Sequence, residues 1–115
     1  MREPDKIAIS FWANAQGREP VREFLQEQPK EDRYKLGTDI RKLQFGWPTG
    51  MPLVKHLGSS LWELRSSLAS KREARIIFVA QNDSLIFLHG FIKKTQKTSA
   101  KDLNLARQRL KDLKL

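Results

Sequence analysis

The pattern of hydrophobic and polar positions predicts one strand and two helices in the first half of the chain. The segment Lys6–Ala13 is rich in β-branched and aromatic residues, which is typical of a strand. Apolar residues then recur at helical spacing after Pro20, and they predict a short helix over about Pro20–Gln28. A second helix is expected from Pro29 until FGWPTG ends it, because apolar residues fall at i, i+4 and i+7, namely Leu36, Ile40 and Leu43.

Alternation with a period of two replaces the helical period in the second half. The segment LWELRSS places Glu63 and Arg65 on one side and Trp62 and Leu64 on the other, so we expect a strand there. EARIIFVA and SLIFLHGFI predict two further strands, joined by the turn-forming residues QNDS. Short connections of this kind favour an antiparallel meander.

A last helix closes the chain. Ser99 is expected to cap it, with Asp102 three residues later reaching back to the cap. Its apolar stripe consists of Leu103, Ala106, Leu110 and Leu113. The predicted order is therefore β-α-α-β-β-β-α, an α+β fold with a small, mainly antiparallel sheet and helices packed on one face. We expect a single domain over residues 1–115, since a second domain would have to share the core of a chain of this length.

Composition narrows the class of protein. The chain has no cysteine, so it has neither a disulfide framework nor a thiolate metal site. It has no apolar run of about eighteen residues that would span a membrane, and its N-terminal segment lacks the long apolar region of a secretory signal. We therefore expect a cytoplasmic protein without a membrane partner.

The net charge of +9 is concentrated in the second half. Residues 1–60 hold ten Lys and Arg against eight Asp and Glu, whereas residues 61–115 hold twelve against five. Clustered cations repel one another unless an anion relieves them, so this asymmetry indicates a polyanionic partner. The alternative is a basic surface that only aids solubility.

Two strand arginines are the first candidates for chemistry. Arg75 opens the apolar run RIIFVA, where a guanidinium is costly unless it meets an anion, and its planar fork suits a phosphate. Arg65 lies in a similar position on the preceding strand. The alternative for Arg75 is an ion pair with Glu63 or Glu73, and the alternative for Arg65 is an ion pair with Glu63.

Further candidates lie beside the strands. Lys93 and Lys94 follow the last strand, with Lys97 close behind, and could meet a nucleic acid as point charges, although such tracts are often only solvated. Lys55 and His56 are expected in a loop before LWELR, where the histidine could act as a general acid or base.

His89 receives a different interpretation. It alternates with Phe87 and Phe91 on one strand face, so we expect a core histidine with a hydrogen-bonded partner.

Several motifs are absent from the sequence, which has no HExxH, no Walker-type glycine loop and no GxSxG. The acidic residues of the second half are too scattered to hold a pair of magnesium ions, so no metal or other cofactor is expected. Arg, Lys and His side chains could still act on RNA, whose 2′-hydroxyl is a built-in nucleophile. The protein then needs only to orient that hydroxyl, assist proton transfer and neutralise the charge of the transition state.

The segments VKHLGSSLWELR, ARIIFVA and FLHGFIKKTQKTSAKDLNLARQRL resemble the phage-derived, HigB-like branch of the RelE toxin superfamily. The resemblance covers residues 53–113 and implies a RelE-like fold. It also implies the toxin of a type II toxin–antitoxin system, an endoribonuclease that cuts mRNA on the translating ribosome. A cognate helix-turn-helix antitoxin would neutralise it in an oligomeric complex.

The resemblance also assigns residues. Arg65, Arg75 and Lys94 match basic residues of the family's active site, with Lys93 beside them, and Lys55 and His56 match a loop that supplies phosphate or acid–base groups. Some relatives place a catalytic tyrosine in the C-terminal segment, whereas the one tyrosine here is Tyr34, so the general base stays open. Two other hypotheses remain at this point: a non-enzymatic nucleic-acid binder and a protein-interaction module of a mobile element.

Overall fold

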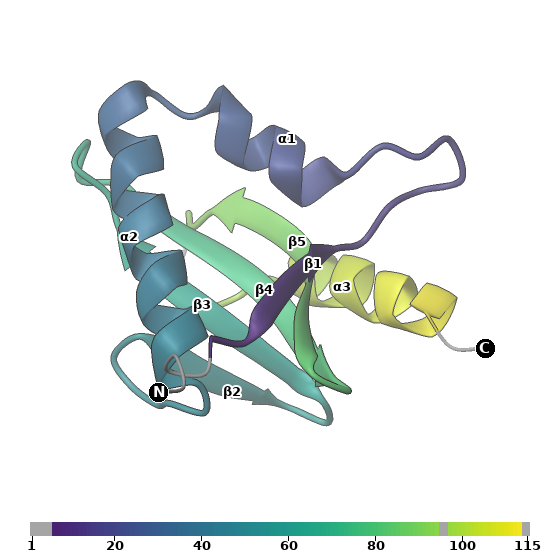
Figure 1. Ribbon diagram of the computed structural model, residues 1–115. Coiled ribbons are helices and arrows are strands. Elements are labelled where there is room, and N and C mark those ends of the chain that lie inside the picture. The colour runs from purple at the N-terminus through teal and green to yellow at the C-terminus, as the bar shows by residue number, and fades with distance from the viewer. Residues whose placement is uncertain (1–5, 95–96, 114–115) are drawn as a thin grey trace.

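A five-stranded sheet forms the middle of the molecule in the computed structural model, which describes residues 6–94 and 97–113 (Figure 1). In chain order the elements are β1 (Ala8–Phe11), α1 (Pro20–Glu27), α2 (Lys30–Gly46), β2 (Val54–Gly58), β3 (Leu61–Ser67), β4 (Glu73–Gln81), β5 (Ser84–Ile92) and α3 (Ala100–Leu113). The strands lie in the order β1-β5-β4-β3-β2. β1 runs parallel to β5 and every other pair is antiparallel, so the prediction of an α+β fold with a mainly antiparallel sheet is confirmed.

Strand β2 was not expected from the sequence. It pairs with β3 through a tight connection in which Gly58 and Ser59 have φ values of +102° and +53°. Lys55 and His56 therefore lie on an edge strand, and the prediction of a loop at these two residues is wrong. The segment VKHLG has only two large apolar side chains, which is too short a pattern to indicate a strand without its partner.

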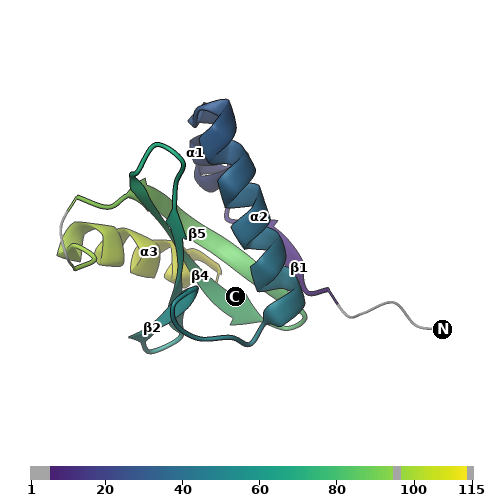
Figure 2. The same ribbon diagram turned by 90° about the vertical axis from the view of Figure 1, so that its left-hand side faces the viewer.

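Helices cover both faces of the sheet. Helices α1 and α2 lie on one face and α3 lies on the other, with the sheet between them (Figure 2). The prediction that all helices pack on one face is therefore wrong. The physical reason lies in β4, whose residues 74–79 are all buried, as expected for a strand that is covered on both sides.

Two apolar clusters correspond to these two faces. The larger cluster packs α1 and α2 against residues such as Leu64, Ile76, Phe78 and Phe87. The smaller cluster packs α3 through Ala106 against Leu61, Ile77, Val79 and Leu88. The surface of the sheet that faces α3 is called the α3 face below.

A bulge in β5 changes which residues share a face. Phe87 pairs with Phe78 and His89 pairs with Ile77, so Leu88 is an extra residue and the alternation shifts by one position. Phe87 belongs to the cluster under α1 and α2, whereas His89 and Phe91 lie on the α3 face, where their rings stack with centroids 5.1 Å apart. The prediction that His89 shares a face with Phe87 is therefore wrong.

Two buried carboxylates attach α2 to the β3 side of the sheet. Asp39 accepts hydrogen bonds from Ser66 Oγ and Lys35 Nζ, both at 2.6 Å. Asp32 accepts hydrogen bonds from the backbone and side chain of Ser70 at 3.0 and 2.8 Å and from Arg72 Nη2 at 2.9 Å. These contacts fix the connection between β3 and β4, and with it the position of Arg72 at the start of β4.

Candidate functional site

Arg65 and Arg75 lie directly opposite each other on β3 and β4. Like charges at such positions destabilise a sheet unless acids lie close to them. The strand period of two places Glu63 and Glu73 on the same face, each two residues from an arginine. The four side chains form a compact cluster on the α3 face, called the arginine–glutamate cluster below.

Arg75 is buried and paired within this cluster. Its side chain is 3% exposed; Nε lies 3.6 Å from Glu63 Oε1, and Nη1 lies 3.2 Å from Glu73 Oε1. Nη1 also donates to the carbonyl oxygen of Ala74 at 3.1 Å. The alternative interpretation of Arg75, an ion pair with Glu63 or Glu73, is therefore observed with both acids, and the expectation of an uncompensated guanidinium is wrong.

Arg65 is held more loosely. Its side chain is 24% exposed, and Nε lies 4.0 Å from Glu63 Oε1, at the limit of an ion pair. Nη1 contacts the sulfur of Met51 at 3.5 Å. Of the two arginines, Arg65 is the one whose guanidinium can reach an added anion without leaving a buried acid unpaired.

Glu63 connects the cluster to the segment that follows β5. Its side chain is 2% exposed and accepts a hydrogen bond from the hydroxyl of Thr98. The backbone N–H of Lys93 donates to the carbonyl oxygen of Glu73 at 2.7 Å. The cluster therefore holds both ends of the lysine-bearing segment, at Lys93 and at Thr98, against the sheet.

Glu73 is the more exposed of the two acids, with 39% of its side chain accessible. Burial raises its pKa, but hydrogen bonds from Ser67 and Arg75 and the positive charges of Arg75 and Lys93 outweigh this effect. The net result is a pKa below the ordinary value for glutamate. Glu73 is therefore a carboxylate at neutral pH, accessible to solvent and surrounded by cations.

A basic groove of about 790 Å³ lies beside this cluster, at the end of β5. Phe24 and Phe91 are among the residues that line it, and Phe91 is the residue directly opposite Arg75. The cations that line the groove are Arg72, Lys93, Lys94, Lys97 and Lys101.

These cations differ in how they are balanced. Arg72 is paired with Asp32, whereas Lys94 and Lys101 have no carboxylate within 4.0 Å among the described residues. The groove therefore carries an excess of positive charge in which a polyanion can bind.

The remaining predicted residues are divided between the two faces. Lys55 lies opposite Glu63 on the α3 face, the same face as Arg65 and Arg75. His56 lies on the other face, where its ring stacks on Trp62 at 4.3 Å and Nε2 lies 3.2 Å from the carbonyl oxygen of Ser59. The structure therefore does not bring His56 together with the arginines.

His89 has the hydrogen-bonded partner expected for a core histidine. Its Nε2 lies 2.7 Å from Asp102 Oδ1, and Asp102 also accepts a hydrogen bond from Ser99 Oγ at 2.6 Å. Burial lowers the pKa of His89 and outweighs the opposing effect of Asp102. The predicted capping of α3 by Ser99 is confirmed, since Ser99 Oγ accepts a hydrogen bond from the Asp102 backbone at 3.1 Å.

Several residues of this region are not evident from the sequence. Lys101 lies just inside α3, and its closeness in the sequence to Lys97 is the signal that could have found it. Arg72 lies just before β4, far from the expected lysines in the sequence, so no such signal indicates it. Glu73 was predicted only as an ion-pair partner. Thr98 carries no chemical signal of its own, and only the folded connection brings it to Glu63.

Neither a metal site nor a membrane span is found within the described part of the chain. No group of three or more His, Asp and Glu side chains there could hold a metal ion. None of the helices described is long and apolar enough to cross a membrane.

The sequence that forms this fold, the basic groove and the arginine–glutamate cluster matches a known protein family. Residues 23–111 match the family described as phage-derived protein Gp49-like (DUF891). This match spans most of the chain, so the chain belongs to the Gp49-like family, which is known in toxin–antitoxin contexts. No curated protein matches the chain.

Proposed function

We propose that this protein is the toxin of a type II toxin–antitoxin system, a metal-independent endoribonuclease that cleaves mRNA on the translating ribosome. The toxin context of the Gp49-like family and the compatibility of the α+β architecture with a RelE-like fold support this proposal, which includes membership of the HigB-like branch of the RelE superfamily. The observation that carries it is the row of residues across one end of the sheet, in which Arg65 lies opposite Arg75 and Arg75 lies opposite Phe91 of the basic groove. The partner in the cytoplasm is a cognate helix-turn-helix antitoxin, bound in an oligomeric complex.

The proposed reaction uses the 2′-hydroxyl of RNA. Its oxygen loses its proton to a base and attacks the adjacent phosphorus, and the bond from phosphorus to the 5′-oxygen of the next nucleotide breaks. The leaving 5′-oxygen takes a proton from water, so the products are a 2′,3′-cyclic phosphate and a 5′-hydroxyl. Arg65 and Lys94 stabilise the additional negative charge of the pentacoordinate transition state. Lys55, Lys93 and Lys97 bind flanking phosphates.

Two residues take roles that differ from the sequence-based expectation. Arg75 is a positioning residue, since it holds Glu63 and Glu73 in place and is buried itself. His56 has no role in this mechanism, because it lies on the opposite face of the sheet.

Glu73 is the proposed general base. It is ionised at neutral pH, partly exposed and next to Lys93, so it can accept the proton of the 2′-hydroxyl. Its pKa is lowered, so the active, ionised form predominates at neutral pH and is lost only as the pH falls through that lowered value.

Replacing Glu73 with glutamine is expected to reduce cleavage by about 100-fold or more, because general base catalysis contributes on this scale. The acid limb of the pH–rate profile should disappear with it. Glutamine keeps an oxygen that can accept the hydrogen bond from Arg75, so the fold should survive. Asp83→Asn, in the exposed turn between β4 and β5, is the matched control and should leave both rate and profile unchanged. A parental pH profile in Glu73→Gln would exclude Glu73 as the base.

The proposed function is tested by adding the purified protein to an in vitro translation reaction and mapping mRNA ends by primer extension. New ends within the coding region are expected within minutes. The double variant Lys93→Ala/Lys94→Ala should produce at least tenfold fewer ends, because it removes two cations of the groove. Translation that proceeds with intact mRNA would contradict the proposal.

One observation favours a second candidate function, a nucleic-acid-binding protein without catalysis. Both arginines lie within 4.0 Å of an acid of their own chain, which leaves the groove as the main cationic surface of this region. Such a protein would bind RNA and duplex DNA with similar affinity, would leave both intact, and would lose affinity steeply as salt rises.

A further inference from the structure

The outward side of helix α2 is a stripe of six residues, of which five are exposed in the described chain and one, Thr38, is half-buried. Its residues recur at i, i+4, i+7, i+8, i+11 and i+15, and they are Lys30, Tyr34, Gly37, Thr38, Arg41 and Phe45. Tyr34 is 80% exposed and Phe45 is 49% exposed, and they are two of the three large apolar residues that are exposed in the described chain. This stripe is called the α2 outer face below.

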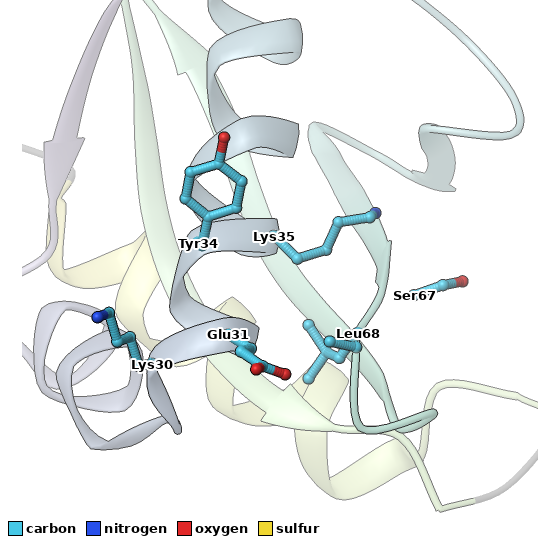
Figure 3. A pocket seen from close by; sticks show the side chains of 7 residues that line it. Lys30, Glu31, Tyr34, Lys35, Ser67 and Leu68 are labelled. Atoms are coloured by element: carbon cyan, nitrogen blue, oxygen red, sulfur yellow. The ribbon is translucent and has the colours of Figure 1, made fainter.

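Two hollows lie on either side of the Tyr34 ring. One, of about 670 Å³, lies between α2 and the end of β3 and is lined by Lys30, Lys35 and Leu68 (Figure 3). The other, of about 810 Å³, is lined by Gly37, Arg41 and Phe45. Tyr34 lines both, and its ring lies over the α2 ribbon in Figure 3. The α2 outer face therefore offers concave apolar surface on both sides of an aromatic ring.

Gly37 lies in the middle of this helix, and no contact among the described residues explains why a glycine stands there. A glycine in a helix interior costs about 1 kcal/mol relative to alanine. A Cβ added at Gly37 would meet nothing within 4 Å, so no packing contact in the described structure requires the missing side chain. A missing side chain on an exposed helix lets the backbone of a second element approach closely at that point.

The charge of the region is strongly positive. Within the described part of the chain, four exposed cations lie on or beside the α2 outer face, against one exposed acid, Glu31; the cations are Lys30, Arg33, Arg41 and Lys42. Among the described residues, Lys30, Arg33 and Arg41 have no carboxylate within 4.0 Å, while Lys42 lies 3.9 Å from Asp39. A partner that fits this face must therefore bring negative charge as well as apolar side chains.

We infer that the α2 outer face is a docking surface for an acidic amphipathic helix of a partner protein. The partner helix crosses α2 at Gly37, its apolar side chains enter the two hollows beside Tyr34, and its carboxylates pair with Lys30, Arg33 and Arg41. This surface does not include the groove, and it meets the arginine–glutamate cluster only at one edge, where Ser67 of the first hollow donates a hydrogen bond to Glu73 at 2.9 Å; none of its residues has a role in the proposed cleavage. The inference therefore does not depend on the proposed ribonuclease activity.

Two other occupants fit less well. A second copy of this chain would bring the same cations against each other, which is costly at an interface. Single-stranded RNA would stack successive bases on neighbouring rings, whereas Tyr34 and Phe45 are eleven residues apart, which is about 16 Å along a helix axis. That separation corresponds to three helical turns and matches the apolar stripe of a partner helix.

The inference is tested with a fluorescein-labelled synthetic helical peptide of about twenty residues, with leucines along one face and glutamates beside them. Fluorescence anisotropy should show saturable binding to the full chain, and at least tenfold weaker binding of the same peptide with lysines in place of the glutamates. Gly37→Leu should weaken binding at least tenfold while raising the melting temperature, since it fills the crossing point and removes a helix glycine. Arg41→Glu should weaken binding about tenfold, whereas the matched charge reversal Arg107→Glu on exposed α3 should change it less than twofold.

Specific results would overturn the inference. These are absent peptide binding, equal binding by Gly37→Leu and the parent, or equal effects of the two charge reversals. Binding of a single-stranded RNA 20-mer that Tyr34→Ala abolishes would assign the face to nucleic acid. A dimer in sedimentation that Gly37→Leu dissociates would assign it to a second copy of this chain. Cleavage of mRNA by Gly37→Leu should match the parent, so failure of this inference is distinguishable from failure of the proposed function.

Discussion

Arg75→Ala is expected to lower the free energy of unfolding by about 3–5 kcal/mol. This is the largest loss of stability that we expect from a single substitution in the arginine–glutamate cluster. The guanidinium is 3% exposed and lies within 3.6 Å of Glu63, which is itself 2% exposed. Removing the arginine leaves a buried carboxylate with Thr98 and the more distant Arg65 as its partners. Urea unfolding followed by tryptophan fluorescence measures the loss, and RNA cleavage should fall in parallel because Glu73 is no longer held.

A double variant separates this effect from a general defect of packing. Arg75→Met combined with Glu63→Leu replaces the buried ion pair with apolar side chains of similar size, and such replacements are often neutral or stabilising. The double variant should therefore be more stable than Arg75→Ala by about 2 kcal/mol or more. If Arg75→Ala unfolds at the same urea concentration as the parent, the buried ion pair does not have the structural role assigned to it.

Arg65→Ala is expected to differ from Arg75→Ala, because it should cause a large loss of cleavage activity with little loss of folding stability. Arg65 is partly exposed and contacts Glu63 only at 4.0 Å, so its removal should cost less than about 1 kcal/mol. Cleavage should fall by about 100-fold, because removal of one positioned donor from a transition state costs on this scale. Primer extension on mRNA from a translation reaction measures the loss, and the urea midpoint measured on the same preparation reports the fold.

Arg107→Ala provides the control, since Arg107 is an exposed arginine of α3 that lies outside the groove and the arginine–glutamate cluster. It should cleave at the parental rate. Arg65→Lys should recover only part of the activity, because an ammonium group cannot offer the planar pair of donors that suits a phosphate. Equal cleavage by Arg65→Ala and the parent would remove Arg65 from the proposed site.

Hydrophobic periodicity predicted α1 and α2 and strands β1, β3, β4 and β5 close to their observed bounds, since each carries a clear period of its own. Strand β2 was missed because VKHLG is stabilised by pairing with β3, a contact between segments that no local pattern reports. The placement of α3 on the second face was missed although the run RIIFVA indicates a strand buried on both sides. A continuous apolar run is therefore a better guide to the number of covered faces than the helix count.

The candidate site was predicted in part. The alternation of β3 placed Glu63 with Arg65, and the structure confirms that these two residues share a face with Arg75. Glu63, the buried partner of Arg75, also accepts a hydrogen bond from Thr98 in the connection after β5, and no periodicity describes that contact. The position of His56 on the opposite face follows from its register with Trp62, and that register required β2 to be recognised as a strand.

The central claim, cleavage through the 2′-hydroxyl of RNA, is tested most directly by one substitution in the substrate. The cut site in an mRNA on a programmed ribosome is mapped first, and the same mRNA is then prepared with a single 2′-deoxynucleotide immediately 5′ to that bond. The mechanism predicts that cleavage at this bond is abolished while the unmodified mRNA is cut to a 2′,3′-cyclic phosphate and a 5′-hydroxyl. Cleavage of the deoxy-substituted bond at the parental rate would contradict the mechanism.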